Sequence, residues 1–272
     1  MRNLLKFPVL IASIIYMATI STAQANIYQQ TLPAWADTLE RFVDSEGRVD
    51  FVALSKDTSK LDEFVEAVGQ VSPENNPELF TSSQEILAYH INAYNALAMR
   101  GVIDRDIPKN FNSLFKRASF FKFRGVTIGQ KRTNLYDYEN KVIRPLGEPR
   151  VHFVLNCMVI DCPRLPNMVL TADTLEEDLQ AATIEFFNNQ KYIKVDDTEQ
   201  KAWLSRLMKF YTKDYVPSGD KQALIAYVNQ YREQIIPQTY KVKFLDYDWT
   251  INQQPMPFVS TSENNDGDRG DS

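Results

Sequence analysis

Both cysteines of the chain and one of its two histidines fall within RVHFVLNCMVIDCPRL, residues 150–165. A cysteine becomes a nucleophile when a nearby histidine takes its proton and an amide or carboxylate orients that histidine. These residue types suit a cysteine-dependent hydrolase or acyl transferase. In that interpretation Cys157 is the nucleophile, His152 its base or orienting group, and Asn156 the polarising group.

The same two cysteines can instead form a disulfide. Four residues separate Cys157 from Cys162, and oxidising compartments favour disulfides in small loops of this kind. The alternative is therefore a non-catalytic binding module that a Cys157–Cys162 disulfide stabilises. Zinc is the weakest interpretation, because cysteine pairs that bind zinc are usually closer in sequence. We expect no metal and no other cofactor.

The element that positions these residues is predicted to be a buried strand over residues 150–156. Alternation along a strand places His152 and Asn156 on one face. Five residues of extended strand span about 16 Å, so His152 and Cys157 would lie about that far apart. The thiol interpretation therefore requires that the following loop folds back, or that another segment supplies the base.

A second element with polar residues is the predicted helix over residues 82–103. Ser82 and Glu85 have capping-box spacing, and Asn92 and Asn95 share one helix face. A buried asparagine is costly unless it forms hydrogen bonds. The two asparagines are therefore expected to hold a loop backbone or to line a cleft. His90 points elsewhere and is expected to pack in the core.

The remaining patterns mix hairpins with strands that helices separate, which predicts the α+β class with a modest mixed sheet flanked by helices. One globular domain is expected over residues 27–258. The predicted helices cover 32–43, 59–71, 133–147, 171–189, 201–215 and 220–235, and the predicted extended segments cover 49–54, 120–129, 191–195 and 240–251.

The two ends of the chain differ from this body. Residues 1–25 have a positive start, an apolar run and small residues at Ala23 and Ala25, which together predict a cleaved signal peptide. The alternative is an uncleaved anchor, for which the apolar run is short. The product is thus expected to be exported, either to the periplasm or to the medium. Residues 259–272 are polar and are expected to form a disordered tail.

The charge of the chain limits its partners. Cleavage of the signal would remove two of the 30 basic residues and leave 28 basic against 35 acidic residues, a net charge of 28 − 35 = −7. An acidic chain is a poor nucleic-acid binder, and we identify no basic stripe with interleaved aromatic residues. No stretch after the signal is long and apolar enough for stable membrane insertion.

The segments HINAYNALAMR, LYDYENKVIR and EPRVHFVLNCMVIDCPRL resemble the domain-of-unknown-function 547 family. The resemblance runs from near Val49 to about Tyr231. Asn140 stands where the family often has histidine, His90 where it usually has tryptophan, and Met158 and Asp161 where it usually has glycine and serine. The matching positions are Asn92, Tyr94, Asn95, Glu139, Arg144, Arg150, His152, Asn156, Cys157, Cys162 and Pro163.

The family's name states that its function is unknown. Its arrangement of helices and sheet with Cys and His is similar to papain and the transglutaminases, which is an analogy of fold and residue type. The resemblance adds Glu139 to Asn92 and Asn95 as residues expected to support Cys157 and His152. The expected function is a thiol-centred cleft that acts on a peptide or a small thiol compound, with the binding module as the alternative.

Overall fold

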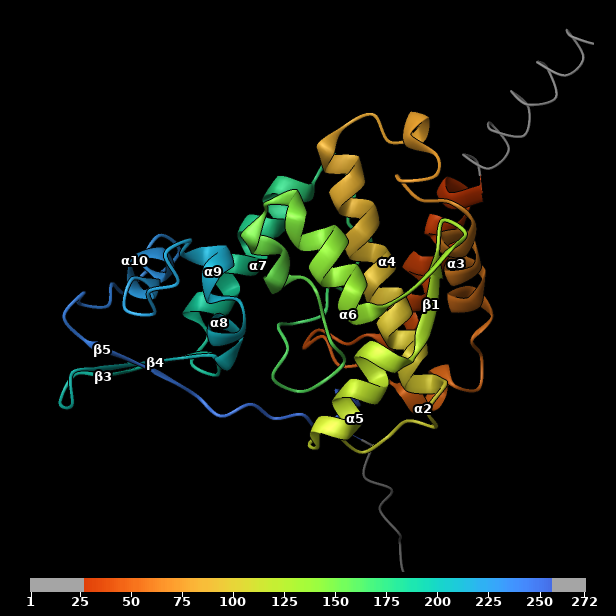
Figure 1. The fold of residues 1–272 in the computed structure, drawn as a ribbon. Coiled ribbons are helices and arrows are strands. Elements are labelled where there is room, and N and C mark those ends of the chain that lie inside the picture. The colour runs from red at the N-terminus through yellow and green to blue at the C-terminus, as the bar shows by residue number, and fades with distance from the viewer. Residues whose placement is uncertain (1–26, 256–272) are drawn as a thin grey trace, which may run out of the picture.

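The computed structural model describes residues 27–255, and the predicted signal peptide and tail lie outside this range. Helices dominate, and two small sheets complete the fold (Figure 1). This arrangement confirms the α+β class. No helix in residues 27–255 is long and apolar enough to cross a membrane.

The helix α4 (Ser83–Ile103) forms the centre of the larger core. Ser82 accepts a hydrogen bond from the backbone N–H of Glu85, and the Glu85 carboxylate accepts one from the backbone N–H of Ser82, as the spacing predicts. Because α4 is buried almost all round, it is enclosed by other helices. The first of these, over residues 27–42, precedes α2 (Phe51–Leu54), α3 (Ser59–Gln70) and η1 (Pro77–Leu79).

The helical segments that follow are mostly short. After α4 the chain forms α5 (Leu114–Ala118), η2 (Ser119–Phe123), α6 (Leu135–Tyr138), η3 (Glu139–Ile143), η4 (Arg144–Leu146), η5 (Pro149–Phe153), α7 (Leu175–Asn188), α8 (Arg206–Phe210), α9 (Thr212–Tyr215) and α10 (Leu224–Val228). Asn134 caps α6, and Gly147, in the left-handed region at φ 80°, ends the run that α6 begins. The sequence had predicted this start, from the cap at Asn134, and this end, from Gly147.

Two sheets carry the strands of the structure. The strands β1 (Gly125–Ile128) and β2 (Lys131–Asn134) form an antiparallel hairpin. The strand β4 (Lys201–Leu204) pairs antiparallel with β3 (Ile193–Asp196) and parallel with β5 (Lys241–Phe244), which makes the mixed sheet that we expected. Figure 1 shows this sheet at one side, beside α8–α10.

The prediction of a buried strand over residues 150–156 is wrong. The chain there forms η5, a 3₁₀-helix with Pro149 at its start, and the Glu148 side chain accepts a hydrogen bond from the backbone N–H of Arg150. Proline fits the first turn of a helix because it has no N–H to donate there. The apolar run is buried as expected, but it is coiled, which shortens the path from His152 to Cys157.

Several other segments differ from the sequence predictions; residues 120–123, expected to be extended, belong to the helix η2. Residues 51–54 are helical because the Asp50 side chain accepts the N–H of Ala53 as an N-cap. Residues 201–204 form β4, which completes the mixed sheet instead of beginning a helix. The hairpin turns at Gly129 and Gln130, both at positive φ, and not at Arg124–Gly125.

A C-terminal strap, residues 245–253, crosses the body after β5 (Figure 1). Its backbone bonds to three segments that are distant in sequence: Trp249 O accepts from Phe111 N, Thr250 O accepts from Ile160 N, and Asn252 O accepts from Val49 N. The strap therefore joins the first, middle and last parts of the described chain. It also brings two aromatic side chains, Tyr247 and Trp249, to the candidate site.

Candidate functional site

A cavity of about 590 Å³ lies between α4, α5–η2, η3, η5, α8 and the strap. Its wall is mostly aromatic and aliphatic, and its polar groups include Glu139, Arg144 and His152. A mainly apolar concavity with a few polar groups is the usual form of a small-molecule site. Both cysteines also line it.

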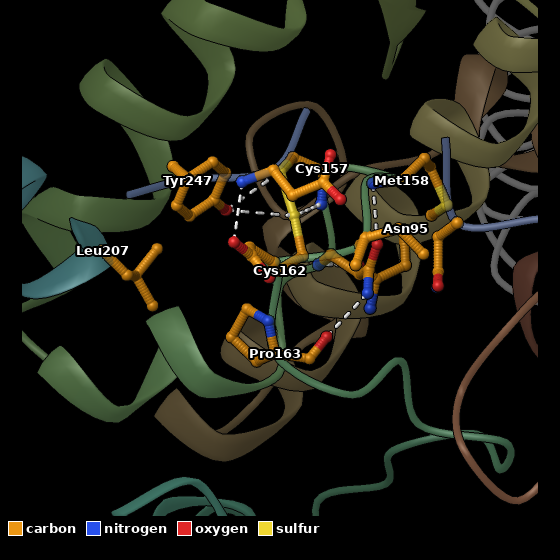
Figure 2. The surroundings of a disulfide bond; sticks show 12 residues. Asn95, Cys157, Met158, Cys162, Pro163, Leu207 and Tyr247 are labelled. Atoms are coloured by element: carbon orange, nitrogen blue, oxygen red, sulfur yellow. Dashed lines mark hydrogen bonds between the residues drawn. A yellow bond between two sulfur atoms is a disulfide. The ribbon is translucent and has the colours of Figure 1, made fainter. Parts of the chain in front are cut away.

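A disulfide joins Cys157 to Cys162 in the wall of this cavity (Figure 2). The Cys157 side is half-buried, whereas Cys162 is 3% exposed. The Cys162 sulfur accepts a hydrogen bond from the backbone N–H of Cys157 at 3.0 Å. The Tyr247 hydroxyl lies 3.5 Å from the Cys162 sulfur and 3.7 Å from the Cys157 sulfur. Burial raises the pKa of Tyr247 well above its ordinary value, so its hydroxyl keeps the proton that it donates.

Two buried asparagines fix the backbone that carries this disulfide. Asn156 accepts a hydrogen bond from Met158 N and donates one to Pro163 O, which closes the loop between the cysteines. Asn95 accepts a hydrogen bond from the Asn156 backbone N–H at 2.8 Å and donates to Val154 O at 2.9 Å. Asn95 therefore holds this loop to α4.

Asn92 and His90, which also lie on α4, do not line the cavity. Asn92 bonds to the backbone of Leu170 through both its amide nitrogen and its oxygen, so it holds a different loop. His90 is 1% exposed, and its Nδ1 lies 2.7 Å from the Tyr138 hydroxyl. The expectation of a packed histidine is thus confirmed.

Met158 occupies a strained position directly after Cys157. Its φ of 63° lies in the left-handed region, where residues other than glycine are uncommon. Glycine would adopt this conformation without strain. The Met158 side chain is fully buried, and this burial offsets the strain.

His152 is held by a charged pair from two other elements. Its Nε2 lies 2.8 Å from Asp214 Oδ2, and Asp214 also receives two hydrogen bonds from Arg144 at 2.6 and 2.7 Å. The imidazole stacks on the Tyr211 ring at a centroid distance of 3.8 Å. These contacts leave the ring little freedom to rotate.

The charge state of Asp214 determines which nitrogen of His152 carries a proton. Burial raises the pKa of Asp214, but the hydrogen bonds from Arg144 and His152 outweigh it and hold the pKa well below its ordinary range. An ionised carboxylate only accepts, so His152 Nε2 donates to it. In the neutral ring Nδ1 is then the basic nitrogen.

A buried carboxylate, Glu139, forms a second polar point of the cavity. It is 8% exposed and accepts a hydrogen bond from the hydroxyl of Tyr94 at 3.2 Å. Burial and the Glu139 charge raise the pKa of both Tyr94 and Tyr211, which keeps both hydroxyls protonated. Glu139 can therefore bind a cationic or hydrogen-donating group of a ligand.

The family model described as "Protein of unknown function, DUF547" matches residues 79–187. This part of the chain is therefore similar to that family. No curated protein and no solved structure matches the chain, so the likeness to papain and the transglutaminases stays a prediction. The matched DUF547 segment contains Glu139, His152 and both cysteines, whereas Asp214 and Tyr247 follow it.

The structure brings Cys157, His152 and Glu139 to one cavity, while the three asparagines support the surrounding backbone. The roles expected of these six residues stay predictions. Asp214 and Tyr247 were missed, because 62 and 90 positions separate them from the groups that they contact. The alternation of Tyr247 and Trp249 was the only local sign that both side chains share a face. No group of three or more potential metal ligands occurs within residues 27–255.

The depressed pKa of Asp214 predicts a loss of stability in acid. A carboxylate whose pKa is lower in the folded state stabilises the fold above its unfolded pKa of about 3.9, and this contribution disappears as pH falls below that value. We expect the free energy of unfolding in urea to fall more steeply below about pH 4 in the wild type than in Asp214→Asn.

The matched control for this experiment is Asp173→Asn, which replaces an exposed aspartate. That variant should follow the wild type at every pH. Equal acid sensitivity of Asp214→Asn and the wild type would show that the Asp214 interactions contribute nothing to stability.

Proposed function

We propose that the cavity binds a small thiol compound or a cysteine-containing peptide and exchanges a disulfide with it. The observation that carries this proposal is the asymmetry of the disulfide. Cys157 is half-buried in the cavity wall, while Cys162 is buried and its sulfur accepts the backbone N–H of Cys157, with the Tyr247 hydroxyl near both sulfurs. A substrate thiolate is therefore expected to attack the Cys157 sulfur, with the Cys162 sulfur as the leaving group.

The exchange balances without any further reactant. A substrate thiolate attacks Cys157 Sγ, the Cys157–Cys162 bond breaks, and its electron pair stays on Cys162 Sγ. The Cys157 N–H and the Tyr247 hydroxyl stabilise that thiolate, because both donate to it. A second substrate thiolate then attacks the mixed disulfide, which releases an oxidised product and leaves the protein as a dithiol.

His152 supplies the proton transfer in this scheme. Its Nδ1 accepts the proton of the incoming thiol, and the resulting imidazolium is stabilised by Asp214. The role as base agrees with the expectation from the sequence, although the attacking thiolate now comes from the substrate. In the reverse direction the reduced Cys157 is the nucleophile.

Disulfide exchange fits an exported protein, because disulfides persist mainly in oxidising compartments. The proposal therefore includes export of the protein from the cytoplasm. The chain recovered outside the cytoplasm should then begin at Asn26 in a mass spectrum, and a soluble cytoplasmic chain that keeps Met1 would argue against export.

A pair of single-cysteine variants tests the exchange. Cys162→Ser leaves Cys157 free in the cavity, and Cys157→Ser leaves the buried Cys162. We expect Cys162→Ser to form a mixed disulfide with glutathione disulfide at least about ten times faster than Cys157→Ser, because access and thiolate character both favour Cys157. Intact-protein mass spectrometry over time gives the two rates.

The same pair tests the alternative, a binding module in which the disulfide is structural. The full burial of Cys162 and the hydrogen bonds that fix its loop favour this candidate. It predicts slow and equal trapping of both variants together with a lower free energy of unfolding for each. That outcome would overturn disulfide exchange and leave the cavity as a binding site.

A further inference from the structure

The segment 109–132 has a local charge that the whole chain does not reveal. It contains seven basic and no acidic residues, while the full chain has a net charge of −5, so the remainder carries −5 − 7 = −12. In the described part of the chain, only Arg124 of these seven forms a salt bridge. The expectation that no basic stripe contains interleaved aromatic residues is wrong for this segment.

The same segment exposes three large apolar side chains. Leu114, Phe115 and Phe123 are 79%, 75% and 72% exposed, and all three belong to the continuous helical stretch α5–η2. Single apolar side chains on a surface are ordinary, whereas several on ten consecutive residues form a patch. On the inner side, Phe120 is buried against Phe111, so the stretch is anchored to the core.

The stretch α5–η2 also forms one wall of the cavity. Leu114, Arg117 and Lys122 line it, Arg117 lies over the Trp249 ring at 4.6 Å, and Lys122 lies over the Tyr136 ring at 4.1 Å. Figure 1 shows α5 at an edge of the molecule, away from the β3–β5 sheet. A partner that covered this stretch would therefore lie beside the cavity.

We propose that α5–η2 docks on the surface of an anionic lipid bilayer. Leu114, Phe115 and Phe123 enter the headgroup region, and Lys116 and Lys122 contact lipid phosphates. Basic residues beside exposed apolar side chains are the combination that binds anionic membrane surfaces. Binding of this kind needs no membrane-spanning helix.

Charge and side-chain type favour a bilayer over other occupants. A second copy of the chain that paired through the same stretch would oppose two α5–η2 segments, each with three basic and no acidic residues. A nucleic acid would match the charge and could stack on Phe115 and Phe123, but it would leave the aliphatic Leu114, the most exposed of the three, without an apolar partner. A bilayer satisfies both the charge and the apolar side chains, and docking places the cavity beside the headgroups.

Vesicle co-sedimentation tests the proposal with the chain as it is recovered from the exporting cell. The probes are phosphatidylcholine vesicles with and without phosphatidylglycerol. We expect binding to the anionic vesicles, weaker binding as salt rises, and no binding to phosphatidylcholine alone. The variant L114S/F115S/F123S should bind the anionic vesicles at least about tenfold more weakly.

The matched control is Ile235→Ser, which removes an apolar side chain 65% exposed on another part of the surface. It should bind like the wild type, and equal thermal melting of all variants would show that folding is intact. Equal binding by the triple variant and the control would overturn the proposal, as would equal binding to both vesicle types or no binding at all. Binding to a single-stranded oligonucleotide that anionic vesicles fail to displace would identify a nucleic-acid site instead. None of these outcomes bears on the disulfide exchange, which is measured by mass.

Discussion

Replacing Asn95 with alanine is expected to lower the free energy of unfolding by roughly 2–6 kcal/mol. The substitution leaves the N–H of Asn156 and the C=O of Val154 without their side-chain partner, and a buried group that loses its hydrogen bond costs about 1–3 kcal/mol. Both groups lie within a few residues of Cys157, so the loop that carries the disulfide loosens as well. Urea unfolding followed by circular dichroism measures the change.

Asn112→Ala provides the control for this experiment. Asn112 is exposed, and its substitution should change the free energy of unfolding by less than about 0.5 kcal/mol. A destabilisation by Asn95→Ala that is no larger than this control would show that the Asn95 hydrogen bonds do not hold the loop. The structural role assigned to Asn95 would then be wrong.

Replacing His152 with glutamine is expected to slow alkylation of Cys157 by about tenfold or more at pH 6.5. A positively charged imidazole in the same cavity would lower the pKa of the thiol below its free value of about 8.5. When the imidazole is removed, each unit by which the thiol pKa rises reduces the thiolate fraction about tenfold at a pH below that pKa. Glutamine keeps a donor near Asp214 but cannot take up a proton. The measurement uses Cys162→Ser protein, in which Cys157 is the only thiol, and reads iodoacetamide addition by peptide mass.

His90→Gln is the matched control, because it makes the same change at the other buried histidine, which contacts Tyr138. Its alkylation rate should equal that of the unsubstituted Cys162→Ser protein. If His152→Gln also leaves the rate unchanged across pH, His152 does not activate Cys157. The proposed proton transfer would then need another group.

The parts of the fold that were predicted correctly depend on local signals. The capping box of α4 and the Asn134 cap of α6 are made by residues three positions apart, so the sequence displays them directly. The prediction at residues 150–156 was wrong because a short apolar run does not distinguish a strand from a buried helical turn. Pro149 was the local sign of the helical start.

The site was predicted as far as residue type and chain proximity allow. Cys157, His152 and Glu139 do reach one cavity, but their arrangement depends on partners that no spacing rule connects. Asp214 orients His152 from a helix 62 residues further on, and Tyr247 reaches Cys162 from a segment 85 residues away. Long-range contacts of this kind are determined by how the whole chain packs.

The strap also determines the order in which the site is completed. A chain is synthesised from its N-terminus, so residues 245–253 are among the last described residues to leave the ribosome. Until they arrive, Cys157 and Cys162 lack the wall that Tyr247 and Trp249 supply. An oxidant therefore has freer access to the two thiols during biogenesis than in the finished protein, and the disulfide is enclosed after it has formed.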